Sequence, residues 1–301
     1  MKTWLKYGIN LERELVTIEE VPSGKTNLVC PFCDSLLIAK KGKIIQHHFA
    51  HNSETCLRVK KGNLPSLPIY DRFHLSLSPQ NFQLLKDLWQ EYKNTDYPII
   101  TVPFELETKK LFEWTPEGYY FTDLGKIPVG GLSLAKFNEV QEPLILSTLE
   151  KLTNSVAIAE AIGGEILAEK TAHLKIYRLQ VRRILRFTLY FLKIQVDGSI
   201  LHKIGVTSRT MSERLIEIKR DLKQYYGQIN IEVIGTWQHR GNVELYFKHR
   251  YQKFNYPIGK LTEYYLFEDI DKVIADLHFM QPKVLTREES KILQSIDGAI
   301  V

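Results

Sequence analysis

The sequence contains little cysteine and lacks a long uninterrupted apolar run. Three cysteines occur in 301 residues, too few for the disulfide frameworks of small secreted domains. No apolar stretch approaches the roughly 20 residues that a transmembrane helix needs. The opening segment, MKTWLKYGINLERELVTIEE, carries charges too early for a secretory signal. We therefore expect a cytoplasmic protein with no membrane partner.

Charge and composition exclude few classes of function. The net charge is +5, with 44% hydrophobic and 25% charged residues, as in ordinary soluble globular proteins. The length suffices for two or three domains, each with its own core. The mild basic excess permits a polyanionic partner without requiring one.

The few cysteines lie together. All three, with three of the nine histidines, fall in the segment CPFCDSLLIAKKGKIIQHHFAHNSETC. The motif Cys30-x-x-Cys33 places two thiolates about 4 Å apart, which suits two corners of a Zn²⁺ tetrahedron. His51 and Cys56 would complete four ligands and use every cysteine. His48 with His51 is the competing pair.

A redox role for the Cys-x-x-Cys motif would require it to open a helix within a βαβ unit. Here Pro31 lies between the cysteines, and the strand-like stretch VTIEEVPSGKTNLV precedes them. The context therefore favours a structural zinc site, which holds a small β-rich module together and performs no chemistry.

This segment resembles the N-terminal module of the CoiA-like competence proteins. The resemblance covers residues 1–61 and implies a zinc-binding module that aids recognition of a substrate or of a protein partner. In that family a nuclease core with a Glu-rich motif follows, but LRVKKGNLPSLPIYDRFH lacks it, so this half implies no nuclease activity. The matching residues are Cys30-Pro31-Phe32-Cys33, Lys41-Gly42-Lys43, His48-Phe49-Ala50-His51 and Cys56.

The middle region, residues 62–172, is predicted to be α/β, and we assign no function to it. Its opening, KKGNLPSLP, has the composition of a linker. Helical periodicity predicts a helix over residues 80–93, and PIITVPFELETKKLFEW is strand-like with Pro103 at a sheet edge. Residues 142–186 are rich in helix formers and are broken at Gly163-Gly164.

Three residues of the middle region are spaced like the D…ExK metal site of many endonucleases: Asp96, Glu107 and Lys109. In such a site two carboxylates hold Mg²⁺ and the lysine orients water or stabilises charge. A Glu-x-Lys pair also arises readily by chance on a solvated strand face. We leave the region unassigned.

Residues 174–186, LKIYRLQVRRILR, form a predicted basic amphipathic helix. Its charged face either contacts a phosphate backbone or is the solvated side of a linker helix. The residues that would contact nucleic acid are Arg178, Arg182, Arg183 and Arg186.

The C-terminal module, residues 173–280, begins with a predicted hairpin, FTLYFLKIQVDGSILHKIGVT. Asp197-Gly198 is a strong type I′ turn signal. This turn places Tyr190 opposite Gly205 and on the same face as Lys203. A loop shifted to Gly198-Ser199 would change the partners but would keep Tyr190 and Lys203 on one face. A glycine opposite a tyrosine would leave room for a substrate to approach.

Two helices follow the hairpin. The first is opened by a capping box, Thr210 with Glu213, which places Arg214 in its first turn. The second begins near residues 241–242 and runs through NVELYFKHRYQKF, with Glu244 and Lys248 on one face. The segment TEYYLFED is strand-like, a helix starts near residue 269, and residues 281–301 form a predicted helical tail.

This order of motifs resembles the GIY-YIG nuclease superfamily, in the phage-type branch whose second motif reads KIG. The first motif lacks its Gly and Ile, and the second Tyr is a Lys. The matching residues are Thr188-Leu189-Tyr190, Lys203-Ile204-Gly205, Arg214, Val243-Glu244-Leu245 with His249 and Phe254, and Glu263-Tyr264-Tyr265.

The resemblance implies a role for each residue. Glu244 would hold one divalent cation, Mg²⁺ or Mn²⁺, and Arg214 would bind the phosphate. Tyr190 would orient or deprotonate the attacking water. Because a free tyrosine has a pKa near about 10, a neighbouring cation would have to lower it, and Lys203 is the candidate. His249 would assist water or bind phosphate.

We therefore predict an α+β protein with a zinc-stapled β-rich N-terminal module, an α/β middle region and a C-terminal GIY-YIG domain. The expected function is metal-dependent hydrolysis of DNA phosphodiester bonds, with the zinc module and the basic helix recruiting substrate. The alternative is a DNA-binding protein whose GIY-YIG domain contacts phosphates without cutting.

Overall fold

The structure, a computed structural model, describes residues 4–42, 45–62, 64, 67, 73, 75 and 77–295. The chain divides into two compact units, which we call unit 1 and unit 2. Lys43 and four of the nine residues of the predicted linker, 63, 65, 66 and 68, lie outside the described residues, as do residues 296–301. Because each unit combines distant segments, the four-region division made above stays a prediction. Unit 1 consists of Met1–Leu67, Ile145–Arg183 and Leu285–Val301, and unit 2 of Pro68–Leu144 and Ile184–Val284.

Unit 1 contains a five-stranded antiparallel sheet with the order β2-β1-β3-β4-β5, which confirms the predicted β-rich start. Alternation places Leu37 and Ala39 of β4 in the core, while Leu36 and Lys40 face solvent. The elements are β1 Tyr7–Ile9, β2 Leu15–Thr17, the 3-10 helix η1 Ile18–Glu20, β3 Gly24–Val29, β4 Leu36–Lys40, β5 His48–His51 and the short helix α1 Leu57–Lys61.

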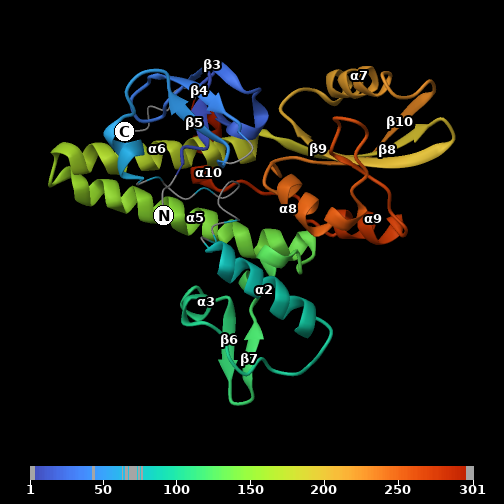
Figure 1. Cartoon of the computed structure of the whole chain (residues 1–301), viewed down its shortest axis with the longest axis horizontal. Helices are drawn as coiled ribbons and strands as arrows, with labels where there is room; N and C mark the ends of the chain where they lie inside the picture. Colours follow the sequence, from blue (N-terminus) through green and yellow to red (C-terminus); the bar gives the residue numbers. More distant parts are fainter. Residues whose placement is uncertain are drawn as a thin grey trace. The chain divides into compact units, whose positions relative to one another are not determined.

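Long helices complete unit 1 (Figure 1). The glycine break is confirmed, because helix α5 (Leu134–Glu160) ends before Gly163 and Gly164, whose φ angles are +72° and +60°. Helix α6 runs over Gly164–Arg186 and α10 over Arg287–Gln294. The division between the units falls within α5 and α6.

Polar contacts join the N-terminal sheet to α6 within unit 1. Arg183 of α6 binds the Glu20 carboxylate and donates to the carbonyl oxygen of Leu15. Arg58 donates to the carbonyl oxygen of Ala168 at 2.8 Å. The small sheet therefore does not rely on its own core alone.

Unit 2 contains a four-stranded antiparallel sheet with the order β10-β8-β9-β11. Helix α7 covers one face, and α8 and α9 cover the other (Figure 1). The mixed helices and antiparallel sheets confirm the predicted α+β class. The elements are β8 Thr188–Val196, β9 Ser199–Thr207, α7 Met211–Leu222, β10 Ile229–Trp237, α8 Val243–Arg250, the 3-10 helix η3 Gln252–Phe254, β11 Tyr264–Tyr265 and α9 Ile270–His278.

The β8–β9 hairpin has the predicted turn and register. Asp197 and Gly198 have φ angles of +43° and +86°, as a type I′ turn requires. Tyr190 pairs with Gly205, and Lys203 pairs with Leu192, two residues along from Tyr190. Tyr190 and Lys203 consequently point to the same face of the sheet.

The predicted helix over residues 80–93 is confirmed as α2, Pro79–Tyr92, whose N-cap Ser78 accepts from the Asn81 N–H at 3.1 Å. The predicted strand over residues 98–114 is wrong in its centre. Helix α3, Phe104–Thr108, starts directly after Pro103, whose fixed φ suits a helix start. The neighbouring elements are β6 Phe112–Thr115, β7 Gly118–Phe121, α4 Asp123–Lys126 and the 3-10 helix η2 Ile127–Val129.

This correction bears on the D…ExK spacing. Glu107 lies in α3 and Lys109 is its C-cap, so the two residues are not on a strand face. Asp96 and Glu107 are exposed. Within the described residues, no hydrogen bond or ion pair joins these three side chains.

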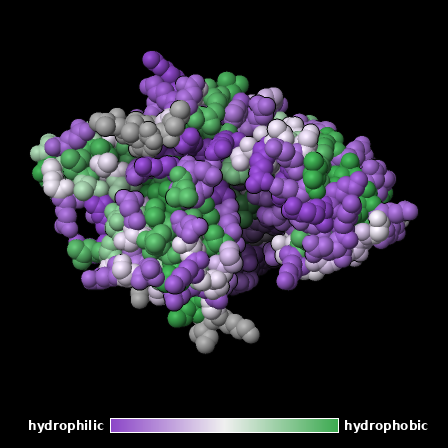
Figure 2. Space-filling view, turned by 90° about the horizontal axis from the view of Figure 1, so that it is seen from above, coloured by the Kyte–Doolittle hydropathy of each residue, from purple (hydrophilic) through white to green (hydrophobic). Residues whose placement is uncertain are grey.

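Figure 2 shows hydrophilic and hydrophobic residues interspersed over the face that it presents. In the part of the chain that the structure describes, no helix combines the length and the apolar composition needed to cross a bilayer.

Candidate functional site

Four predicted zinc ligands come together in unit 1. The ligand atoms of Cys30, Cys33, His51 and Cys56 all lie within 4.8 Å of one another. The Sγ atom of Cys33 lies 3.3 Å from Nε2 of His51. Three thiols and one imidazole form a usual donor set for structural zinc.

Local backbone structure positions these ligands. Cys30 follows β3 directly, and the turn after it is closed by the Asp34 N–H donating to the Cys30 carbonyl oxygen at 3.0 Å. His51 is the last residue of β5, and Cys56 is the N-cap of α1. A turn, a strand end and a helix start thus converge on one point.

The protonation tendencies at this cluster differ between the ligands. Burial lowers the pKa of His51 and so favours the neutral imidazole that a metal requires. Burial raises the pKa of the Cys30 thiol. At Cys33 burial also raises the pKa, but hydrogen bonds with Ser35, Cys30 and Cys56 together outweigh burial and lower the pKa. The cluster is compatible with zinc, which would deprotonate the thiols that it binds.

His48, the alternative ligand, is engaged elsewhere. Its Nδ1 lies 2.8 Å from the carbonyl oxygen of Gln46, and its ring centroid lies 4.2 Å from that of Trp4. The structure therefore brings together the set with His51 and Cys56.

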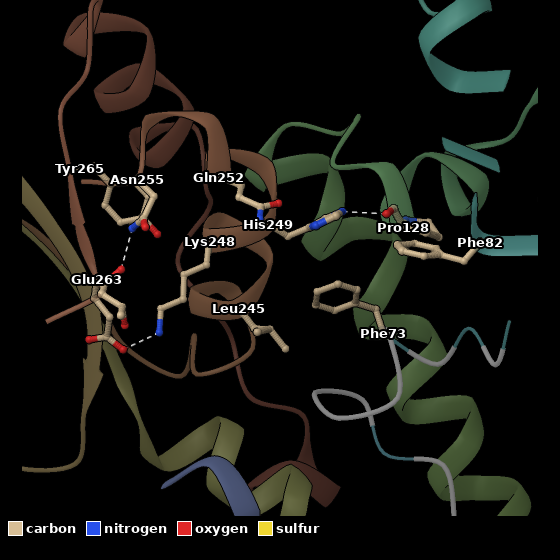
Figure 3. Close-up of a pocket in the computed structure, with 11 residues that line it drawn as sticks. Phe73, Phe82, Pro128, Leu245, Lys248, His249, Gln252, Asn255, Glu263 and Tyr265 are labelled. Atoms are coloured by element: carbon tan, nitrogen blue, oxygen red, sulfur yellow. Dashed lines mark hydrogen bonds and ion pairs between the residues drawn. The ribbon is translucent and has the colours of Figure 1, made fainter. Parts of the chain in front are cut away.

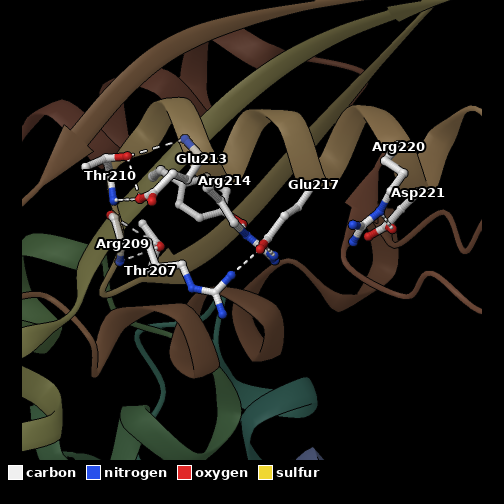
Figure 4. Close-up of polar contacts among 9 residues, drawn as sticks. Thr207, Arg209, Thr210, Glu213, Arg214, Glu217, Arg220 and Asp221 are labelled. Carbon is white, nitrogen blue, oxygen red and sulfur yellow. Dashed lines mark hydrogen bonds and ion pairs between the residues drawn. The ribbon is translucent and has the colours of Figure 1, made fainter.

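A second cluster, which we call the charged cluster, lies in unit 2 and contains four of the five predicted catalytic residues. Its first contact joins β8 to α7, where Nε of Arg214 donates to the Tyr190 hydroxyl at 3.1 Å. Arg214 also binds Glu217 at 2.9 Å, and Arg209 binds the same carboxylate (Figure 4). The capping box of Thr210 and Glu213 is confirmed and fixes the start of α7.

The second half of the charged cluster is centred on Glu263, just before β11. Its carboxylate binds Nζ of Lys203 at 2.8 Å and Nζ of Lys248 at 2.6 Å. Lys248 also binds Glu244 at 3.2 Å, so one ammonium group bridges two carboxylates. Figure 3 shows Lys248 reaching from α8 to Glu263, beside a pocket of about 460 Å³.

Burial and charge set the ionisation of these carboxylates. Burial would raise the pKa of Glu263, but the ammonium groups of Lys203 and Lys248 outweigh it and lower the pKa to about 2. At Glu244 burial dominates and raises the pKa, although Lys248 opposes this. Glu263 is consequently the firmly ionised partner, and Glu244 is the carboxylate whose charge is less favoured.

Tyr190 does not have the lowered pKa that a general base would need. It is fully buried, and burial raises its pKa to about 12 even though Arg214 favours the phenolate. The cation that contacts its hydroxyl is Arg214, whereas Lys203 is bound to Glu263. The predicted activation of Tyr190 by Lys203 is therefore corrected: at neutral pH the hydroxyl keeps its proton.

Comparison with known proteins identifies one segment. Residues 14–58 match the family model "Competence protein CoiA, N-terminal domain". The match contains all four residues of the zinc-compatible cluster and confirms the predicted resemblance for this segment. No curated protein and no solved structure matches the chain significantly. The charged cluster lies outside the matched residues.

His249 was expected at the charged cluster and lies outside it. Its Nε2 donates to the carbonyl oxygen of Pro128 at 2.7 Å, away from Lys248 (Figure 3). The side chain one helical turn after Glu244 that reaches the cluster is Lys248. Our sequence reasoning did not place Lys248 or Glu263 among the site residues. The i, i+4 spacing of Glu244 and Lys248 was the available signal.

The four arginines predicted to bind nucleic acid do not form one open face. Arg183 is held by Glu20, and Arg178 lies 3.9 Å from Glu288. Arg178 and Arg182 line a cavity of about 470 Å³ whose walls come from α5, α6 and α10. Arg186, at the end of α6, is exposed. Their contact with nucleic acid stays a prediction.

Gly205 does not leave room for a substrate, as the sequence had suggested, and its packing leads to a prediction about stability. A Cβ atom at this position would overlap the hydroxyl and ring of Tyr190, so the glycine makes room for the tyrosine rather than for a substrate. We expect Gly205→Ala to lower the free energy of unfolding by about 1–3 kcal/mol, as overpacking in a core does. Chemical denaturation would measure this.

Gly227→Ala is the matched control, because its Cβ would meet nothing closer than the Asp197 carboxylate at 3.7 Å. Equal denaturation midpoints for the two alanine variants would contradict the close packing of Tyr190 on Gly205.

Proposed function

We propose that the protein is a metal-dependent endonuclease that hydrolyses DNA phosphodiester bonds at the charged cluster. The contact of Arg214 with the Tyr190 hydroxyl carries the proposal, because it joins two residues whose positions follow the GIY-YIG pattern. Glu244 and Lys203 also fall in this cluster. Four groups at motif spacing, from four separate elements, are what a phosphodiesterase site of this type requires.

The carboxylates are suited to hold a cation. Glu244 and Glu263 both bind the ammonium group of Lys248, so their oxygens can face one positive charge. Mg²⁺ or Mn²⁺ would be held by Glu244 with Glu263 beside it, and would polarise the scissile phosphate. Arg214 offers a guanidinium fork that matches phosphate oxygens. Tyr190, which is buried and protonated at neutral pH, would position Arg214 through the hydrogen bond to its hydroxyl.

The N-terminal module would aid recognition of substrate or of a partner protein in this proposal. Its support is the match to the CoiA N-terminal domain, together with the zinc-compatible cluster. A closed Cys₃His site stabilises a module and performs no chemistry. We place the protein in the cytoplasm, where thiols stay reduced.

A non-cleaving DNA-binding protein is the second candidate, and one observation favours it. Lys248 already neutralises both carboxylates that a metal would use. In this alternative, Arg209 and Arg214 would contact phosphates without a metal.

The test is nicking of supercoiled plasmid with Mg²⁺ or Mn²⁺, with a chelator control. We expect wild-type nicking that Arg214→Lys slows by about a hundredfold, as loss of one positioned donor does. Arg220→Lys is the matched control, since Arg220 lies on the same helix and its side chain is 74% exposed. Tight DNA binding without cleavage of any supercoiled, linear or single-stranded substrate would establish the alternative.

A further inference from the structure

An aromatic pocket of about 480 Å³, lined with lysines, lies in unit 2. It is formed by α2, residues 93–99, the strand β7 and residues 126–136. Of its 14 lining residues six are aromatic, three are lysines and none is acidic. The aromatic residues are Trp89, Tyr92, Tyr97, Tyr119, Tyr120 and Phe121, and the lysines are Lys93, Lys126 and Lys136.

The aromatic wall is held in place by packing. The rings of Trp89 and Phe121 meet edge to face with centroids 5.2 Å apart. A Cβ atom at Gly131 would come within 2.6 Å of the Trp89 ring, so the glycine allows the close contact. Ile99 and Leu132 are buried beneath. Because these rings are already fixed, a ligand could stack on them at a small cost in side-chain entropy.

Two of the three lysines, Lys126 and Lys136, are held by partly exposed ion pairs, and Lys93 donates to the side-chain oxygen of Gln90 at 2.7 Å. Nζ of Lys126 and of Lys136 lie 3.1 Å and 3.6 Å from the Asp123 carboxylate, and Lys136 also binds Glu139 at 3.0 Å. Exposed pairs of this kind contribute little to stability. A phosphate could therefore replace a carboxylate at either ammonium group.

We propose that this pocket binds single-stranded nucleic acid. Bases would stack on the open aromatic faces, including Tyr97, whose exposed fraction is 77%, and phosphates would be bound by the lysines. Surfaces that bind single strands combine these two features. A duplex hides the faces of its bases, and an acidic peptide has few rings to stack, so neither uses the whole pocket. The inference does not depend on cleavage at the charged cluster.

The experiment measures binding of a fluorescent dT12 oligonucleotide to the full chain in chelator, by anisotropy. We expect Tyr97→Ala to weaken binding about tenfold, as loss of one stacked base does. Lys136→Ala should reduce the slope of log K against log salt by about 0.7, the value for one phosphate contact on a single strand.

Two variants outside the pocket serve as matched controls. Phe279→Ala removes another exposed aromatic residue, and Lys272→Ala breaks another exposed i, i+3 ion pair, Lys272–Asp269. Both should bind dT12 within twofold of wild type. The proposal is overturned if the pocket variants bind like wild type, if all four variants lose affinity equally, or if the pocket variants lose affinity only for a 12-base-pair duplex or for poly-glutamate. Since the chelator prevents cleavage, the result is separate from that of the nicking assay.

Discussion

Loss of Cys33 from the zinc-compatible cluster is expected to unfold the N-terminal module. In Cys33→Ala the site keeps three donors, one fewer than structural zinc requires. Metal binding at such sites contributes about 10–16 kcal/mol of apparent free energy, which exceeds what a small sheet supplies from its own core. We expect about one zinc per wild-type chain and almost none in the variant, with rapid trypsin cleavage between residues 4 and 62. Elemental analysis and limited proteolysis would measure both effects.

His48→Ala is the control for this experiment, and His51→Ala is its counterpart. Both histidines belong to β5, but only His51 directs a ring nitrogen to Cys33. His48→Ala should retain its zinc, and His51→Ala should lose it. The opposite pattern would make His48 the ligand. A wild-type chain that purifies without zinc, and binds none when it is added, would exclude a zinc site.

Local patterns in the sequence predict much of this fold. The Asp197-Gly198 turn determines the hairpin register, and with it the pairing of Tyr190 with Gly205. The Thr210–Glu213 capping box predicts where α7 begins. The Cys-x-x-Cys motif with His51 and Cys56 predicts a cluster that the structure brings together. In each case the signal and the structure lie within a short segment of chain.

Contacts between distant segments escape such reasoning. Lys248 and Glu263 meet because α8 packs beside β11, which no local pattern states. The Arg183 guanidinium is bound by the carboxylate of Glu20, which is 163 residues away in the sequence. The strand predicted around Pro103 is interrupted by α3, because the fixed φ of proline suits the start of a helix. Pairing partners, and hence pKa shifts, require the tertiary structure.

Replacement of Glu244 by alanine is expected to abolish plasmid nicking while DNA binding persists. A metal contributes several kcal/mol to stabilising a transition state, and each 1.36 kcal/mol corresponds to about a tenfold change in rate. We therefore expect nicking to slow by about a thousandfold or more. Glu244→Gln should give nearly the same loss, since the amide keeps a hydrogen-bond acceptor for Lys248 but not the charge. Agreement of the two variants would separate loss of charge from loss of packing.

Glu268→Ala is the matched control, because Glu268 is an exposed glutamate of the same module. It should nick like wild type. If Glu244→Ala nicked plasmid at the wild-type rate, Glu244 would take no part in the cleavage reaction.

Lys248→Gln distinguishes the two proposed functions at the same site. Its ammonium group and a metal ion would compete for the carboxylates of Glu244 and Glu263. If a metal binds there, removing the ammonium group should tighten Mn²⁺ binding, and Glu244→Ala should weaken it, both measured by titration calorimetry. If Lys248 is instead the permanent counter-ion of a site that only binds DNA, Lys248→Gln should weaken DNA binding and leave Mn²⁺ binding unchanged. The two functions thus predict different consequences for Mn²⁺ binding from a single substitution.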